Sequence, residues 1–369
     1  MPPRLSRRKL IQSFGCTLAT TALTSKPVAV SAQKGQWPPL DNPSTPKICL
    51  GVRADLDAAG MRRIKQIGVD FVLTGGPPIP WTEGAVRDRI NLYKTGGLTL
   101  CNMMISGFAK TIYGREGRDE EIDKVRQSIV AAGKAGLAVI EYNFYAHRII
   151  EGYHAEVGRG GAGMAAFDYD KVKDLPPLPE IGAHSLDSMW ANITYFLKAV
   201  VPAAVEAGVR LALHPNDPPA PISRGSGQIM STLAGWKRLV DIVKSPANGI
   251  TFDCGVTREL GEDPVAVARY FGSRDCTNHV HFRNVRVRKP YEKYTEVFLD
   301  EGQVDMFAVM RELVRQKYGR GLYPEHPRAI DYDRERDEIR NQYPGGGGFG
   351  GEIYNVGYTR AMLQAALSL

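Results

Sequence analysis

The sequence has little cysteine: five residues in a chain of 369. Apart from Cys16 near the N-terminus, they are Cys49, Cys101, Cys254 and Cys276. These four are too sparse and too irregularly spaced to predict a disulfide framework. No G-x-G-x-x-G follows any apolar run either, so the signature of a dinucleotide-binding sheet is missing. The remaining composition, 43% hydrophobic and 24% charged, is that of an ordinary globular protein.

The chain also lacks a basic patch outside its N-terminus. The net charge is +7, but residues 1–34 hold six of the 47 basic residues and no acid, which leaves 41 basic against 40 acidic residues. A nucleic-acid footprint is therefore not expected. The basic segment instead contains the pair Arg7 and Arg8, a weakly apolar stretch at 10–23 and a small-residue stop at Val30-Ser-Ala32.

This N-terminal pattern predicts a twin-arginine signal peptide at 1–32, and so export to the periplasm. The stretch 10–23 is too short and too rich in Thr and Ser to span a bilayer, so no membrane association is expected after cleavage. A disordered basic N-terminus is the alternative. Residues 33–47 are proline-rich and predict an extended arm.

From residue 48 onward, short apolar runs alternate with amphipathic segments. The predicted strands are 48–52, 70–74, 98–105, 137–144, 210–214, 250–254, 279–283 and 322–326. Helical periodicity appears at 55–67, 119–135, 189–207 and 305–318. Glycines at the ends of AAGKAG, VEAG and KYGRG predict C-terminal helix caps. Eight such units predict one (βα)₈ barrel over residues 48–369, of α/β class. A doubly wound open sheet is the alternative.

Two inserts interrupt this alternation, at 144–188 and at the glycine run 345–351. For the glycine run we expect a flexible surface loop. Both inserts follow or flank strand C-termini, the end of a barrel that carries its active site.

Polar side chains end four consecutive predicted strands, beginning with the fifth. They are His214, Asp253 with Cys254, His279 with His281, and Glu325 with His326. Imidazoles and carboxylates at one barrel mouth are the ligands of a divalent transition metal. Each of them taken singly is more often structural, but four in succession favour a site.

Strand alternation refines this choice. Thr251 and Asp253 share one face of their strand, whereas Ile250, Phe252 and Cys254 share the other, which suits packing against helices. We therefore predict Asp253 as the ligand, with Cys254 as the fallback. His281 lies closer to the mouth than His279 and is the predicted ligand, which gives His279 a supporting catalytic role.

Further residues at strand ends are candidates for substrate contact and catalysis. Glu141 and Asn143 share one face at the end of the fourth strand, and both are predicted to bind substrate. Arg53 follows the first strand, where its planar guanidinium suits a substrate carboxylate, although it could equally pair a neighbouring acid. His326 is predicted to move protons or orient the substrate, while its neighbour Glu325 binds the metal.

With these residues in view, the chain resembles the mannonate dehydratase family from about residue 48 to the C-terminus. The resemblance rests on RDEEIDKVRQSIVAAGKAGLAVIEYNF (118–144), HPNDPP (214–219), GITFDCG (249–255), HFRN (281–284), DEGQVDM (300–306) and GYTRAMLQA (357–365). It implies a barrel related to the xylose-isomerase-like sugar enzymes. The implied metal is one divalent ion, typically Mn²⁺, with Mg²⁺, Co²⁺, Fe²⁺, Ni²⁺ or Zn²⁺ as alternatives.

The resemblance also implies a reaction and a ligand set. The family removes water from an aldonic acid to give a 2-keto-3-deoxy acid, and a metal stabilises the enediolate formed when the α-proton leaves. Carried over by motif, the ligands are His214, the 253–254 position, His281 and Glu325. Arg283 of HFRN is expected to contact the substrate. The partner is a sugar or sugar acid, and a homo-oligomer is compatible with the sequence.

The chain departs from the family pattern at several of these positions. Aligned on Gly255, Asp253 stands where the family has a cysteine, and Glu325 replaces an aspartate. The family's tyrosine after Pro-Gly is replaced by glycines after Pro344. These departures keep a metal-dependent sugar isomerase or epimerase as the alternative function. A non-catalytic sugar-binding protein is the third hypothesis.

Overall fold

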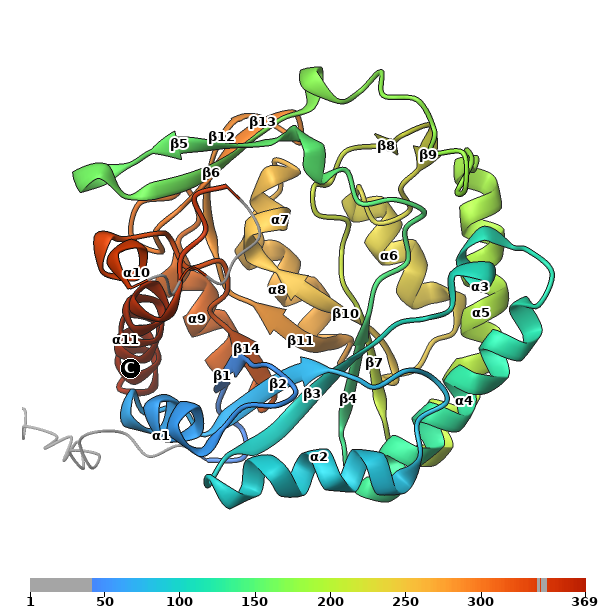
Figure 1. The fold of residues 1–369 in the computed structure, drawn as a ribbon, viewed down its shortest axis with the longest axis horizontal. Coiled ribbons are helices and arrows are strands. Elements are labelled where there is room, and N and C mark those ends of the chain that lie inside the picture. The colour runs from blue at the N-terminus through green and yellow to red at the C-terminus, as the bar shows by residue number, and fades with distance from the viewer. Residues whose placement is uncertain (1–41, 337–338, 340–343) are drawn as a thin grey trace, which may run out of the picture. The chain divides into compact units, whose positions relative to one another are not determined.

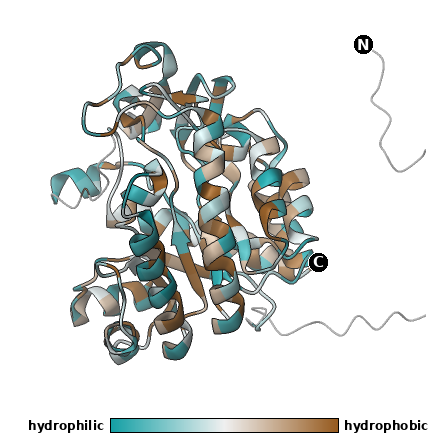
Figure 2. Ribbon diagram, turned by 90° about the vertical axis from the view of Figure 1, so that its right-hand side faces the viewer, coloured by the Kyte–Doolittle hydropathy of each residue, from teal (hydrophilic) through white to brown (hydrophobic). Residues whose placement is uncertain are grey.

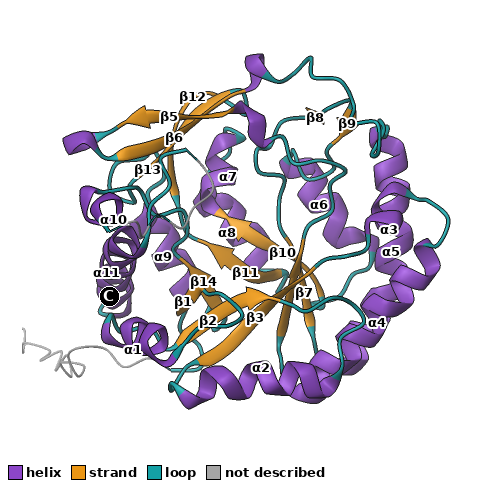
Figure 3. Cartoon of the chain, in the orientation of Figure 1, coloured by secondary structure: helices purple, strands orange, loops and turns teal. Residues whose placement is uncertain are grey.

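The eight strands expected from the sequence form one closed, all-parallel barrel. The computed structural model describes residues 42–336, 339 and 344–369. The barrel strands are β1 (Lys47–Gly51), β2 (Phe71–Gly75), β3 (Thr99–Ile105), β4 (Val139–Tyr142), β7 (Arg210–Leu213), β10 (Asn248–Asp253), β11 (Thr277–His281) and β14 (Gly321–Tyr323). They follow one another round the barrel as β1-β14-β11-β10-β7-β4-β3-β2, as Figure 3 shows. The predicted (βα)₈ barrel is confirmed.

A helix follows each barrel strand and lies outside it (Figure 1). These helices are α1 (Ala58–Gln66), α2 (Glu83–Thr95), α4 (Arg118–Ala135), α5 (Leu186–Ala207), α6 (Leu233–Ile242), α8 (Pro264–Gly272), α9 (Met306–Arg315) and α11 (Phe349–Leu367). Three shorter helices are α3 (Ala109–Tyr113), α7 (Cys254–Glu259) and α10 (Asp331–Glu335). Figure 2 shows hydrophobic strands enclosed by helices that carry hydrophilic residues.

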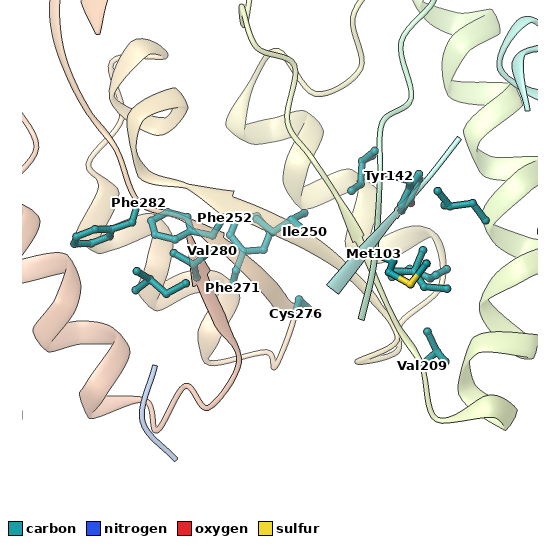
Figure 4. Close-up of a cluster of buried hydrophobic side chains, with 14 of the residues drawn as sticks. Met103, Tyr142, Val209, Ile250, Phe252, Phe271, Cys276, Val280 and Phe282 are labelled. Carbon is teal, nitrogen blue, oxygen red and sulfur yellow. The ribbon is translucent and has the colours of Figure 1, made fainter. Parts of the chain in front are cut away.

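The core between strands and helices follows the predicted alternation. Ile250 and Phe252 of β10 are fully buried in the main hydrophobic cluster together with Phe271 of α8, and Figure 4 shows these side chains next to one another. Thr251 and Asp253 alternate with them and face the barrel interior, where the Thr251 hydroxyl donates to Glu141. The parity argument therefore assigns each side chain of β10 to the correct face.

Two of the three predicted glycine caps are confirmed. Gly136 ends α4 and Gly208 ends α5, both in the left-handed conformation. The third is wrong: α9 ends at Arg315, and the left-handed residue after it is Lys317.

The first insert contributes two strands to a second sheet. β5 (Tyr153–Val157) and β6 (Gly163–Asp168) pair with β13 (Lys293–Val297) and β12 (Asn284–Lys289) in the order β12-β13-β6-β5, all antiparallel. A bridge between Gly163 and Ala329 ties this sheet to the segment that follows β14. The insert also contains the 3₁₀ helices η1 (Ile150–Gly152), η2 (Arg159–Gly161) and η3 (Tyr169–Lys171). A further short hairpin, outside the insert, joins β8 (Ile222–Ser223) to β9 (Ser226–Gly227).

The glycine run 345–351 is not the flexible surface loop that its composition predicts. The backbone N–H groups of Gly348, Gly350 and Gly351 donate to the Asp333 carboxylate at 2.7–3.0 Å. Asp333 is buried, and its carboxylate accepts hydrogen bonds from backbone N–H groups at the start of α11 that have no partner within the helix. At Gly345, with φ +75°, a Cβ atom would lie 2.3 Å from the Met164 carbonyl oxygen. Glycine is required there by close packing rather than by flexibility.

None of the helices in the described ranges is both long and apolar enough to cross a membrane. The predicted signal peptide at 1–32 and residues 33–41 of the predicted arm lie outside the described residues.

Candidate metal centre and active site

Four side chains meet inside the C-terminal end of the barrel: two at the ends of β10 and β11, and two just after β7 and β14. They are His214, Asp253, His281 and Glu325, and one ligand atom of each lies within 4.8 Å of the others. His281 Nδ1 lies 3.0 Å from His214 Nε2 and 3.0 Å from Glu325 Oε2. His214 Nε2 lies 3.9 Å from Asp253 Oδ2. These are the four residues that the sequence predicts as ligands.

The second nitrogen of each imidazole faces an acceptor. His214 Nδ1 lies 2.7 Å from the Pro215 carbonyl oxygen, which can only accept, so Nδ1 carries a proton and Nε2 bears a lone pair. His281 Nε2 lies 3.3 Å from Glu141 Oε1, which leaves Nδ1 directed at the cluster. Such outer partners fix ligating histidines in metal sites.

This donor set fits a cation. The lone pair of His214 Nε2 faces His281 Nδ1, and lone pairs 3.0 Å apart repel unless a proton or a metal ion lies between them. Two buried carboxylates add negative charge to the same point. Burial opposes a charge on His281, but Glu325 and Glu141 outweigh it and raise its pKa well above the usual value. The cluster thus attracts positive charge.

Asp253, and not Cys254, belongs to the cluster. Asp253 ends β10, and its Oδ1 accepts the Val256 N–H at the start of α7, which orients the carboxylate. Burial raises its pKa to about 6. The Cys254 thiol points the other way, 3.3 Å from the Arg283 carbonyl oxygen. Burial raises the pKa of this thiol as well, which disfavours a thiolate ligand.

Separate substitutions of Asp253 and Cys254 test which of the two residues binds the metal. Asp253→Asn is expected to lose bound metal, whereas Cys254→Ala is expected to keep the stoichiometry of the unaltered protein, because only Asp253 reaches the cluster. Metal analysis of both purified variants measures the difference. Loss of metal from the Cys254 variant with retention in the Asp253 variant would reverse the assignment.

Arg283 lies behind the cluster rather than in contact with the open cavity. Its side chain is 2% exposed, and its guanidinium nitrogens lie 2.6–3.9 Å from the oxygens of five carboxylates. The five acids are Asp217, Asp253, Glu259, Glu296 and Glu325. Arg283 therefore serves as the counter-charge that holds Asp253 and Glu325 in place. Its contact with substrate stays a prediction.

Glu141 and His279 also lie deeper than expected, whereas Asn143 is partly buried. Glu141 is 1% exposed and accepts hydrogen bonds from the Asn102 amide and the Thr251 hydroxyl. Burial opposes its ionisation, but His281 lowers the pKa of Glu141 below the usual value. It supports His281 and is not among the residues that line the cavity over β1, β2 and β14, so its substrate contact stays a prediction.

His279 is fully buried beneath His281, and burial lowers its pKa to about 4. Neither ring nitrogen has a hydrogen-bond partner among the described residues. It is not among the residues that line the cavity, and its catalytic role stays a prediction. The Asn143 amide lies 3.8 Å from the Met104 sulfur and does not line the cavity either.

A cavity of about 800 Å³ extends over the ends of β1, β2 and β14. Its lining includes Arg53, Tyr323, Glu325, His326 and Glu352. Of the two alternatives for Arg53, the structure shows the local pair: its Nη2 lies 2.8 Å from Asp55 Oδ2, and the side chain is 83% exposed. A substrate carboxylate would have to compete with Asp55 there.

His326 is the predicted catalytic residue that both lines the cavity and lies next to a ligand. Its Nε2 is 3.5 Å from Glu325 Oε2, and its Nδ1 is 2.8 Å from Glu296 Oε2. Burial opposes its charge, but Glu296 and Glu325 raise the pKa of His326. The sequence analysis missed Glu296, because nothing in the pattern of β13 shows that this strand reaches the barrel mouth.

Comparison with known proteins shows which family the chain belongs to. A family profile for D-mannonate dehydratase (UxuA) matches residues 183–368. The mannonate dehydratase of Enterococcus faecalis is 30% identical over 320 residues, which cover 74% of this chain and 87% of that protein. That of Streptococcus equi subsp. zooepidemicus is 31% identical over 250 residues, which cover 60% and 68%. This chain belongs to the mannonate dehydratase family.

The solved structure of mannonate dehydratase from Streptococcus suis serotype 2 superposes with a TM-score of 0.78 at 26% identity and covers 87% of this chain and 95% of that one. The half of the chain that matches the mannonate dehydratase profile contains all four members of the cluster. A xylose isomerase-like barrel from Mycobacterium smegmatis, with a TM-score of 0.55 at 14% identity, shares the fold alone.

Proposed function

We propose that the protein dehydrates an aldonic acid, with mannonate as the first candidate, to a 2-keto-3-deoxy acid. The observation that carries this proposal is the convergence of His214, Asp253, His281 and Glu325 at the C-terminal end of the barrel, beside a cavity large enough for a sugar acid. Membership of the mannonate dehydratase family supports the hydro-lyase reaction.

We further propose that these four residues hold one divalent cation, with Mn²⁺ as the first candidate. Two imidazole nitrogens and two carboxylates make a harder ligand set than one that contains a thiolate, and the two carboxylates favour an ion such as Mn²⁺. When bound, the ion would act as a Lewis acid toward the oxygens of the substrate. Arg283 and Glu141 would keep Asp253, Glu325 and His281 in the orientation that the ion needs.

Proton transfer and binding of the substrate carboxylate are assigned to side chains that line the cavity. We propose that His326 Nε2, which lies next to Glu325, exchanges a proton with the substrate, either at C2 or at the departing C3 hydroxyl. Arg53 stands at the cavity wall, where it can bind the substrate carboxylate in place of Asp55.

A panel assay tests the reaction. The protein is loaded with Mn²⁺ and incubated with mannonate and other aldonates, and the 2-keto-3-deoxy acids are quantified. Product is expected from at least one aldonate, and removal of the metal with a chelator is expected to abolish it until Mn²⁺ is restored. If no aldonate yields product while aldoses and ketoses interconvert, the isomerase alternative replaces dehydration. The epimerase-like neighbours share the fold alone, so no specific observation favours that alternative now.

We propose, in addition, that residues 1–32 direct export through the twin-arginine pathway, as the pair Arg7 and Arg8 indicates. A reporter fused behind residues 1–40 is expected to reach the periplasm, and Arg7→Lys with Arg8→Lys is expected to retain it in the cytoplasm. Equal periplasmic signal from both fusions would contradict the proposal.

A further inference from the structure

His326 contacts a carboxylate that does not come from the barrel. Glu296 lies on β13, in the antiparallel sheet β12-β13-β6-β5, and its Oε2 is 2.8 Å from His326 Nδ1. The Arg328 guanidinium donates to the same oxygen at 2.9 Å. Since a carboxylate oxygen accepts, Nδ1 carries the proton in this contact. Nε2 is then the ring nitrogen next to Glu325, at 3.5 Å from its Oε2.

The position of Glu296 is fixed by the sheet. β13 is a central strand, paired with β12 on one side and β6 on the other, and Glu296 is opposite Ala165 of β6. Its neighbour Thr295 bonds to Glu156 and faces the opposite side. Glu296 itself is 1% exposed. The pairing of β13 with β12 and β6 therefore places this buried carboxylate beside His326 at the barrel mouth.

The backbone of His326 is also held in an unusual conformation. Its φ is +48°, in the left-handed region that residues other than glycine rarely adopt. The Arg328 Nε donates to the His326 carbonyl oxygen at 2.9 Å, so Arg328 bonds to both members of the pair. Strain of this kind persists where the surroundings determine the conformation.

We infer that Glu296 is a positioning residue that holds His326 as the Nδ1–H tautomer, with Nε2 on the side of the ring next to Glu325 and the cavity. The inference rests on the proposed function, since it concerns the proton that His326 exchanges. It gives the sheet β12-β13-β6-β5 a part in catalysis. In other sites of this type, the orienting partner of a histidine decides which ring nitrogen reacts.

Steady-state kinetics and histidine NMR test this inference together. In Glu296→Gln, kcat is expected to fall about 10–100-fold, as for other partners of active-site histidines, while KM for the aldonate stays within about twofold and metal content is unchanged. Glu156→Gln is the matched control, because it alters a hydrogen-bonded carboxylate of the same sheet that contacts Arg288 and Thr295 instead. Its kcat is expected to equal that of the unaltered enzyme.

The tautomer is measured directly in the unaltered, Mg²⁺-loaded protein labelled with ¹⁵N-histidine. A proton on His326 Nδ1 is expected. A ring protonated at Nε2 alone would overturn the inference, and so would a Glu296→Gln enzyme that keeps its kcat or loses affinity for substrate instead. If Glu296→Gln does not fold, the tautomer decides the question. If no aldonate is dehydrated, the proposed function fails, yet the tautomer still tests the positioning.

Discussion

Replacing His281 by alanine is expected to remove bound metal and to lower kcat/KM for dehydration by at least about 10³-fold. His281 Nδ1 lies 3.0 Å from both His214 Nε2 and Glu325 Oε2, so the alanine variant loses the proposed ligand that lies between the other two. A Lewis acid contributes several kcal/mol to such a reaction, and each ~1.4 kcal/mol is tenfold in rate. Metal analysis and the aldonate assay measure the two effects.

The control for this variant is His154→Ala. His154 lies on β5, outside the cluster of candidate ligands, and its replacement is expected to leave metal content and rate unchanged. If His281→Ala still binds one equivalent of metal with the affinity of the unaltered protein, the proposed ligand set is wrong.

Arg283→Met is expected to destabilise the fold by about 3–5 kcal/mol, the usual cost of removing one partner from a buried ion pair. Methionine retains much of the volume of arginine but none of its charge. Five acids within 3.9 Å of the guanidinium would lose their shared counter-charge. Urea unfolding of the metal-free protein measures the loss without a contribution from bound ion.

Arg288→Met is the matched control. Arg288 also pairs with a glutamate, Glu156, but its side chain is 55% exposed. Pairs of this kind contribute about 0–1 kcal/mol. If the two arginine variants lose the same small amount of stability, Arg283 is not the electrostatic support of the site.

The barrel and its cluster were predictable because both follow from local rules. Buried parallel strands appear as apolar runs, and strand alternation determines which side chains enter the barrel. This is why Asp253 could be preferred to Cys254 without coordinates. The strand-end rule was also sufficient to select His214, His281 and Glu325, because the C-terminal ends of all eight strands meet at one mouth.

The supporting groups could not be predicted in this way because they come from elements distant in sequence. Glu296 reaches His326 only through the pairing of β13 with β6, across an insert whose composition suggests no strands. The environment of Arg283 joins carboxylates that are spread over residues 217–325, and no spacing in the sequence encodes it. The glycine run was misjudged for the same reason. Its buried conformation depends on Asp333 and on contact with Met164.

The central claim is most directly tested by anomalous diffraction from crystals of the protein loaded with Mn²⁺. One anomalous peak per chain is predicted among His214 Nε2, Asp253, His281 Nδ1 and Glu325, at bonding distance from each. A chain that binds no ion under these conditions, or that binds it away from these four side chains, would contradict the account.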